Sequence, residues 1–215
     1  KFSSTTVASD FSLPGEAAKL VAGRPDVIFH LAAIVSGETE QDFDKGYRIN
    51  LDGTMQLFAA IRAIGDGYKP RVVFTSSIAV FGAPFPDKIN DTFLNAPLTS
   101  YGAQKATCEL MVSDFSRKGF IDGISIRLPT ICVRPGKPNR AASSFMSSIL
   151  REPLNGQEAI CPVEADFLHY YISPRRCVEN LVKGAELNAA DIGQNRVMQM
   201  PGKTWSIAQV IEAMT

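Results

Sequence analysis

The sequence has no excess of charge of either sign and no long hydrophobic run. Its 22 basic and 22 acidic side chains cancel, which removes the electrostatic case for binding nucleic acid or an anionic membrane. No apolar stretch approaches the roughly 20 residues that a membrane-spanning helix needs. The first residues, KFSSTTVASDFS, lack the apolar core of a secretion signal. We therefore expect a cytoplasmic protein with neither nucleic acid nor a membrane as partner.

Cysteine and histidine are also scarce, with four and two residues respectively. The cysteines are far apart in the sequence and form no CxxC spacing, and no histidine pair lies near them, so the pattern of a metal site is missing. The simplest interpretation is that all four are reduced, small core residues and that the protein holds no metal. These cysteines are Cys108, Cys132, Cys161 and Cys177.

The sequence does contain an alternation of short apolar runs and amphipathic stretches. The runs DVIFHLAAI and PRVVFTSS are typical of strands buried on both faces of a parallel sheet. Alternating strands and helices predict an α/β fold, a doubly wound parallel sheet of the Rossmann type. We expect strands at 5–9, 26–34, 70–77 and 123–133, and helices at 14–23, 44–65 and 100–118.

The sequence after residue 134 is less regular. Helices are expected near 141–151, 175–188 and 206–214, with a short strand in NRVMQM. We therefore divide the chain into a dinucleotide-binding domain of residues 1–134 and a partial substrate-binding lobe of residues 135–215.

Candidate catalytic residues follow from where such sheets bind their ligands, at the carboxyl ends of the strands. Removing hydride from a secondary alcohol needs a base for the hydroxyl proton, and a phenol serves only if positive charge lowers its pKa. Lys105 lies one helical turn after Tyr101, on the same face, and can supply that charge. Ser77, at the end of the strand 70–77, can hold the substrate oxygen. A tyrosine and a lysine at this spacing occur by chance in many helices, but the strand ending in TSS makes the combination specific.

Several segments resemble the extended short-chain dehydrogenase/reductase superfamily, of the epimerase/dehydratase type. They span most of residues 5–136 in the order of that family: SD at 9–10, DVIFHLAA, YRINLDGT, VVFTSSIAVFG, SYGAQKATCE and IRLPTICVRPG. The resemblance implies an NAD-dependent oxidoreductase acting on CH–OH, with Ser77, Tyr101 and Lys105 as the catalytic set and Tyr101 as the base.

The same resemblance implies a set of cofactor-binding residues. Asp10 would bind the adenine amino group, Asn50 would support the lysine, and Thr130 would flank the nicotinamide. The full set is Asp10, Phe11, Leu31, Ala32, Ala33, Ser36, Asn50, Thr75, Tyr101, Lys105, Leu128 and Thr130.

The family's glycine-rich GxxGxxG turn, whose helix N-terminus binds the pyrophosphate, has no counterpart before residue 10. The segment that distinguishes NAD from NADP is missing too, so NADP stays open. We expect this chain to be an internal piece of a longer enzyme that alone binds dinucleotide poorly and is inactive.

The later motifs point to a subgroup. ADFLHYYISPRR stands where sugar-nucleotide enzymes carry RDxxxVxD, whereas RLPTICVRPGKPNRAASSF and REPLNGQEAICPV resemble the D-erythronate dehydrogenase group. That resemblance implies oxidation of the 2-hydroxyl of a small sugar acid to the 2-keto acid. An L-threonine dehydrogenase, a nucleotide-sugar 4-epimerase and a non-catalytic dinucleotide-binding protein stay open as alternatives.

An acid substrate would need a guanidinium for its carboxylate. Arg134, Arg140, Arg175 and Arg176 are available in the expected lobe, and we favour Arg175. Ser36, Ser77 and Tyr101 complete the expected substrate contacts.

Two further expectations concern single residues and assembly. His30, inside an apolar strand, should be a hydrogen-bonded core histidine. His169 either faces the substrate or packs the lobe. By resemblance, the helices at 44–65 and 100–118 are expected to pair with a second subunit in a homodimer.

Overall fold

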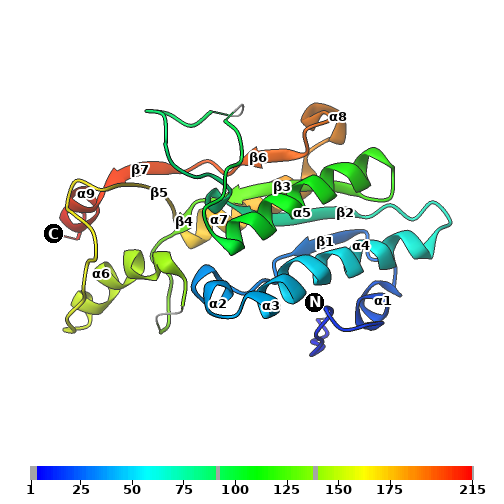
Figure 1. The fold of residues 1–215 in the computed structure, drawn as a ribbon, viewed down its shortest axis with the longest axis horizontal. Coiled ribbons are helices and arrows are strands. Elements are labelled where there is room, and N and C mark those ends of the chain that lie inside the picture. Colours follow the sequence, from blue (N-terminus) through cyan, green and yellow to red (C-terminus); the bar gives the residue numbers. More distant parts are fainter. Residues whose placement is uncertain (1–3, 91–92, 138–139, 215) are drawn as a thin grey trace.

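The computed structural model describes residues 4–90, 93–137 and 140–214. The main sheet has four parallel strands in the order β1-β2-β3-β6, and a smaller sheet has the order β4-β5-β7 (Figure 1). The strands are β1 (Val27–His30), β2 (Arg71–Ser77), β3 (Asp122–Leu128), β4 (Thr130–Ile131), β5 (Leu168–Ile172), β6 (Val197–Gln199) and β7 (Lys203–Ser206). The parallel α/β architecture expected from the sequence is confirmed.

Helices connect the strands and cover both faces of the main sheet. The α-helices are α1 (Glu16–Val21), α2 (Ser36–Gln41), α3 (Phe43–Gly46), α4 (Gly53–Ile64), α5 (Ser100–Arg117), α6 (Phe145–Leu154), α7 (Pro174–Glu186), α8 (Ala189–Ile192) and α9 (Ile207–Glu212). Short 3-10 turns are η2 (Ile78–Val80) and η3 (Ala142–Ser144), and a π-helical segment, η1 (Tyr47–Asp52), joins α3 to α4. None of the described helices is long and apolar enough to span a bilayer.

Alternation along β2 explains how the sheet is buried on two sides. Val72 and Phe74 join the cluster formed with α4 and α5, which includes Phe58 and Val112. Val73, between them, points the other way into a second cluster with α7 and β6. Each cluster removes apolar side chains from water at about 25 cal/mol per Å², so together they hold β2 and α5 in place. The site residues at the end of β2 thus lie on a rigid support.

The edge strand β1 departs from the expectation of burial on both faces. Val27 and Phe29 are 43% and 41% exposed, while His30 is buried. The reason is that β1 pairs only with β2 among the described residues, and the face that carries Val27 and Phe29 is open. The strand expected at 5–9 does not form either, since those residues have no strand partner.

The carboxyl-terminal part also differs from the sequence-based expectation. Pro129 divides the strand expected at 123–133 into β3 and β4, as a residue without a backbone N–H cannot continue a ladder. Strands β5 and β7 were not anticipated. The domain boundary at residue 134 stays a prediction. The division of the chain between the two sheets does not coincide with that residue. β4 belongs to the small sheet, whereas β6 returns to the main one. Residues 1–3 and 215, the ends of the expected domains, lie outside the described residues.

Candidate active site

The end of β2 and the start of α5 bring the three expected catalytic residues together. Lys105 Nζ donates a hydrogen bond to the Thr75 carbonyl oxygen over 2.7 Å. It lies 4.6 Å from the centroid of the Phe74 ring and 5.7 Å from that of Tyr101. Ser77 follows two residues after Thr75, at the last position of β2. The Ser77 hydroxyl, the Tyr101 phenol and the Lys105 ammonium therefore lie close together, where the sequence spacing predicts them.

The local sequence explains how α5 begins at this point. Thr99 is the N-cap residue, and its side chain accepts a hydrogen bond from Gly102 N over 3.1 Å. Gly102 also lets the helix approach η2, because a Cβ there would overlap the carbonyl oxygen of Ala79. The helix start that carries Tyr101 is thus pressed directly against the segment after Ser77.

Burial controls the charge of Lys105. It lowers the pKa of the ammonium to about 8, while the nearby Cys108 and Glu109 raise it. At neutral pH the lysine therefore keeps its proton despite being buried.

The pKa of Tyr101 is raised, chiefly because burial penalises the phenolate, and hydrogen bonding from Ser77 opposes this. The expectation that the lysine lowers the net pKa below its ordinary value is wrong for this structure. Desolvation is the larger effect.

A backbone N–H group two residues later orients the Ser77 side chain. Its oxygen accepts a hydrogen bond from Ala79 N over 3.1 Å, which caps η2. A hydroxyl has one donor and two acceptor positions, so the bond from Ala79 leaves its proton for the Tyr101 oxygen or for a substrate oxygen that replaces it.

Asn50 supports the site less directly than the resemblance implies. Its side chain accepts from Ile34 N over 2.9 Å and donates to Ile34 O and to Gln104 Oε1 over 3.1 and 2.7 Å. It therefore ties the segment after β1 to the residue next to Lys105, with no hydrogen bond to the lysine itself. Gln104, fully buried beside the lysine, was missed because one glutamine in a helix carries no recognisable signal.

The expected adenine contact already has protein partners. Asp10 accepts hydrogen bonds from Ser12 N over 3.1 Å, Ser12 Oγ over 2.5 Å and Arg48 Nη1 over 3.0 Å. These bonds, led by that of Ser12, lower the pKa of Asp10. Arg48 was not singled out from the sequence, because its partner lies far away in the chain.

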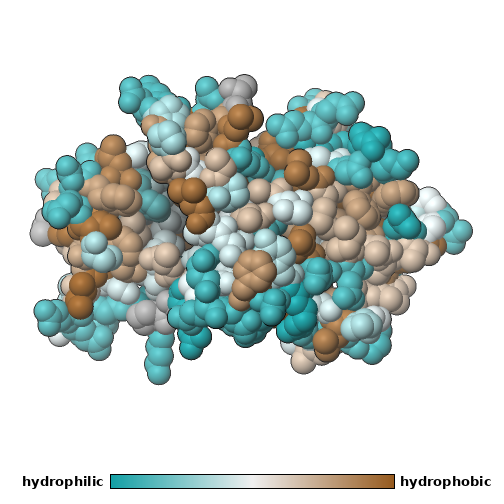
Figure 2. Space-filling view, in the orientation of Figure 1, coloured by the Kyte–Doolittle hydropathy of each residue, from teal (hydrophilic) through white to brown (hydrophobic). Residues whose placement is uncertain are grey.

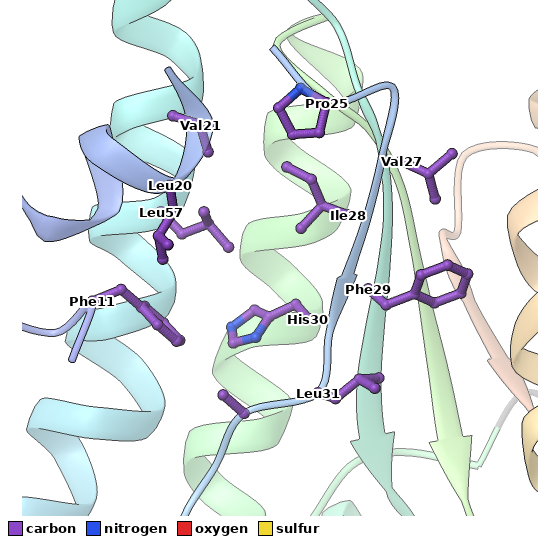
Figure 3. Close-up of a pocket in the computed structure, with 11 residues that line it drawn as sticks. Phe11, Leu20, Val21, Pro25, Val27, Ile28, Phe29, His30, Leu31 and Leu57 are labelled. Atoms are coloured by element: carbon purple, nitrogen blue, oxygen red, sulfur yellow. The ribbon is translucent and has the colours of Figure 1, made fainter. Parts of the chain in front are cut away.

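Phe11, Leu31 and Ala32, expected at the cofactor, line a pocket of about 360 Å³ beside β1. Figure 3 shows Ile28 and His30 pointing towards Phe11 and α4, with Phe29 on the opposite side. None of the three expected catalytic residues lines this apolar pocket.

His30 in that pocket is a core histidine, as expected. Its Nε2 lies 2.8 Å from Thr54 Oγ1, whose hydroxyl donates to the Asn50 carbonyl over 2.7 Å. Nε2 must therefore be the donor towards Thr54. Burial, helped by the charge of Lys105, lowers the pKa of His30 to about 3, so the ring is neutral.

Leu128 and Thr130 lie next to Ser77 of the expected catalytic set. Leu128 is the register partner of Ser77, and Thr130 follows it across Pro129. Thr130 Oγ1 is 2.7 Å from His169 Nε2, and the His169 ring stacks on Phe167. His169 thus contacts a residue expected at the nicotinamide and also packs the lobe.

The expected substrate residues Ser36 and Arg175 lie in different surroundings. Ser36 begins α2, and its Oγ accepts a hydrogen bond from Ala142 N over 3.2 Å, so it joins that helix to the lobe. Arg175 has an 89% exposed side chain and pairs with Glu179 over 2.9 Å. This arrangement gives no support to Arg175 as a carboxylate ligand. Arg134 has a buried Nη2 without a partner in the part of the chain described, which leaves the donors of that nitrogen free.

The four cysteines are free, and Cys108 and Cys177 belong to the two core clusters of the main sheet. Within the described ranges, no group of three histidine, cysteine or acidic residues could hold a metal ion.

Comparison with known proteins agrees with this geometry. Residues 3–169 match the model of the NAD-dependent epimerase/dehydratase family. The chain belongs to this family. It is 48% identical over 208 residues to a D-erythronate dehydrogenase of Cupriavidus necator, covering 97% of this chain and 64% of the relative. A D-erythronate dehydrogenase of Haemophilus influenzae is 44% identical over 197 residues, covering 92% of this chain and 62% of the relative.

A solved structure gives a similar result. The crystal structure of a nucleoside-diphosphate-sugar epimerase from Agrobacterium tumefaciens superposes with a TM-score of 0.93 at 64% identity. The match covers 96% of this chain and 61% of that one. The chain thus spans less than two thirds of the length of these relatives.

Proposed function

We propose that the protein containing this chain is an NAD-dependent dehydrogenase that oxidises a secondary alcohol with Ser77, Tyr101 and Lys105. The observation that carries the proposal is the buried Lys105 ammonium, bonded to the Thr75 carbonyl beside Tyr101 and Ser77. A module that only binds dinucleotide could use the lysine, but it would not need the serine and the phenol beside it. A non-catalytic role is therefore the weaker candidate.

Each side chain has a defined part in this reaction. The Ser77 hydroxyl donates a hydrogen bond to the substrate oxygen, and the Tyr101 phenolate takes the proton from that oxygen. A bound nicotinamide would supply the acceptor for the hydride from the carbon that carries this oxygen. Burial raises the pKa of Tyr101, and the positive charge of Lys105 beside it opposes that effect without cancelling it. Lys105 keeps its proton and therefore favours ionisation of Tyr101.

The residues present fit a nicotinamide dinucleotide. An ammonium has three donors, and the described contacts of Lys105 use one, which leaves others for ribose hydroxyls. Phe11 and residues 31–33 would lie along the adenosine half, with Asp10 at its end, while Leu128 and Thr130 would flank the nicotinamide. We propose NAD as the cofactor, with NADP as the alternative.

For the substrate we propose a small sugar acid of the D-erythronate type, oxidised at its 2-hydroxyl to the 2-keto acid. The names of the two curated relatives and the sequence of residues 127–163 support this choice. Nucleotide-sugar epimerisation is the second candidate, because the 64% identical solved structure carries that name. The two differ in outcome, since a dehydrogenase releases reduced cofactor and an epimerase does not.

The test is NAD reduction by the full-length protein with D-erythronate, L-threonine or a UDP-hexose. We expect turnover with the sugar acid and a loss of roughly a thousandfold or more in kcat for Tyr101→Phe, with NAD affinity unchanged. Tyr68→Phe is the matched control, because its hydroxyl bonds Pro25 O at the other end of the sheet.

The three substrates and the Tyr101→Phe variant distinguish between the candidate functions. Turnover with threonine would keep the base and change the substrate. Conversion of the UDP-hexose without net NADH would favour the epimerase. Full activity of Tyr101→Phe would contradict the assigned base whatever the substrate.

We also propose that the enzyme is a cytoplasmic homodimer. Four free cysteines fit a reducing compartment. The outer faces of α4 and α5 expose Met55 and Leu110, which a second subunit could cover.

A further inference from the structure

A buried ion pair lies one helical turn beyond Lys105. Glu109 follows Tyr101 and Lys105 on the same face of α5, at successive turns. Arg127, from β3, binds it with two parallel bonds, Nε to Oε1 and Nη2 to Oε2, each 2.8 Å long. Both residues are buried, and Phe81 lies 4.8 Å from the guanidinium carbon. This is the strongest geometry that an arginine and a carboxylate can adopt.

The same carboxylate also holds two further segments. Ser76 Oγ donates to Glu109 Oε1 over 2.5 Å, and Asn95 Nδ2 donates to Oε2 over 3.0 Å. Arg127 Nη2 closes the ring with a 2.8 Å bond to Asn95 Oδ1. Glu109 therefore joins α5, the end of β2, the end of β3 and the loop that rises between β2 and α5 in Figure 1.

Burying two charges is a poor way to gain stability, because well-packed apolar residues of the same volume usually serve as well. The network instead fixes the position of the end of β2 along α5. Two successive residues of β2 are tied to two successive turns of α5, Thr75 O to Lys105 and Ser76 Oγ to Glu109. With both ties made, the strand end cannot slide along the helix, and the next residue is Ser77.

We propose that Ser76 and Glu109 are positioning residues that hold Ser77 in register with Tyr101. The proposal rests on the catalytic set assigned above, and no role in binding the substrate or the cofactor is assigned to either residue. Ser76 is the informative position, since Glu109 keeps Arg127 and Asn95 when the serine hydroxyl is removed. The variant is thus expected to fold.

The experiment compares Ser76→Ala with Ser125→Ala in the full-length protein. Ser125 is a matched control, because it is equally buried on the neighbouring β3 and its hydroxyl has no partner among the described residues. We expect Ser76→Ala to lower kcat about tenfold, with KM and NAD affinity unchanged within about twofold. Ser76→Thr, which retains the hydroxyl, should restore most of the rate. Ser125→Ala should stay near the parent.

A second readout needs no substrate. The Tyr101 phenol is titrated by NMR of a carbon-13 label on its Cζ, assigned with Tyr101→Phe. Because hydrogen bonding from Ser77 lowers the pKa of Tyr101, a displaced Ser77 should raise that pKa further. Lys105, whose Nζ lies 5.7 Å from the centroid of the Tyr101 ring, is unchanged in all these variants.

The outcomes are distinct. A higher Tyr101 pKa in Ser76→Ala alone, with the kcat loss where turnover is seen, supports the positioning role. An unchanged Tyr101 pKa, or the same change in Ser125→Ala, overturns it. If the parent protein turns over none of the substrates, the proposed function fails, while the titration still decides the positioning role.

Discussion

Three residues in and around this site carry an ionisable group in the protein interior, and the structure compensates each one in a specific way. Lys105 has a carbonyl partner and Glu109 has a guanidinium, while His30 is kept neutral by its surroundings. An unpaired buried charge would cost several kcal/mol. The pH therefore affects the stability of this protein through buried ionisable groups as well as through groups on its surface.

His30 makes the free energy of unfolding depend on pH. Its folded pKa of about 3 lies below the value of about 6.5 for the unfolded chain, so between these the unfolded state binds the extra proton. The stabilisation is fully present above pH 6.5 and is lost as the pH falls towards 3. Urea unfolding should show a loss of about 1.4 kcal/mol between about pH 7.5 and 5.5.

His30→Gln is the control for this prediction, since glutamine can still donate to Thr54 but does not titrate. The pH dependence in that window should flatten. An equal slope in both proteins would assign the effect to other groups.

At the scale of elements, α5 contributes most to the site, because Tyr101, Lys105 and Glu109 occupy one face of it. Its start can reach the segment after β2 only because residue 102 is glycine.

Gly102→Ala tests that close approach. Helix propensity alone would favour alanine by about 1 kcal/mol. The new Cβ, however, would overlap the Ala79 carbonyl and lie 2.9 Å from Pro97 Cβ, so we expect a net loss of about 1–3 kcal/mol. Since Tyr101 is the preceding residue, kcat should also fall at least about tenfold. Urea unfolding and initial rates measure the two effects.

Gly23→Ala is the comparison, because a Cβ there would meet nothing within 4 Å. It should change stability by less than about 0.5 kcal/mol. Equal behaviour of the two variants would show that α5 shifts without cost and that the close approach is unimportant.

At the scale of the whole molecule, two sheets are joined by a chain that leaves the main sheet at β4 and returns to it at β6 (Figure 1). The face formed by α4 and α5 shows apolar side chains among hydrophilic ones (Figure 2). Leu110 on α5 is 70% exposed there.

Leu110→Glu should convert the proposed dimer into a monomer, because a charge buried in an apolar interface lacks a partner. Leu154→Glu, at a 73% exposed leucine of α6 away from that face, should leave the assembly unchanged. Light scattering of the full-length protein gives the mass directly. A monomeric parent protein would contradict the proposal, and a dimer unaffected by Leu110→Glu would place the interface elsewhere.

The sequence by itself determined the elements whose pattern is local. A continuous apolar run predicted a strand at 70–77, where β2 covers 71–77, and the predicted helix at 100–118 ends one residue after α5. Both predictions hold because neighbouring elements cover the faces that carry the apolar residues. The shared helix face of Tyr101 and Lys105 was also predictable, since residues one turn apart lie side by side, whereas their catalytic role stays a prediction.

Only the tertiary structure decided what depends on contacts between distant segments. The open face of β1, the strands β5 and β7, and the partners of Glu109 depend on which segments lie beside them. The raised pKa of Tyr101 belongs here too, because desolvation is a property of the packed site and not of the residue order. Spacing along the chain places side chains on faces, and packing then decides what those faces meet.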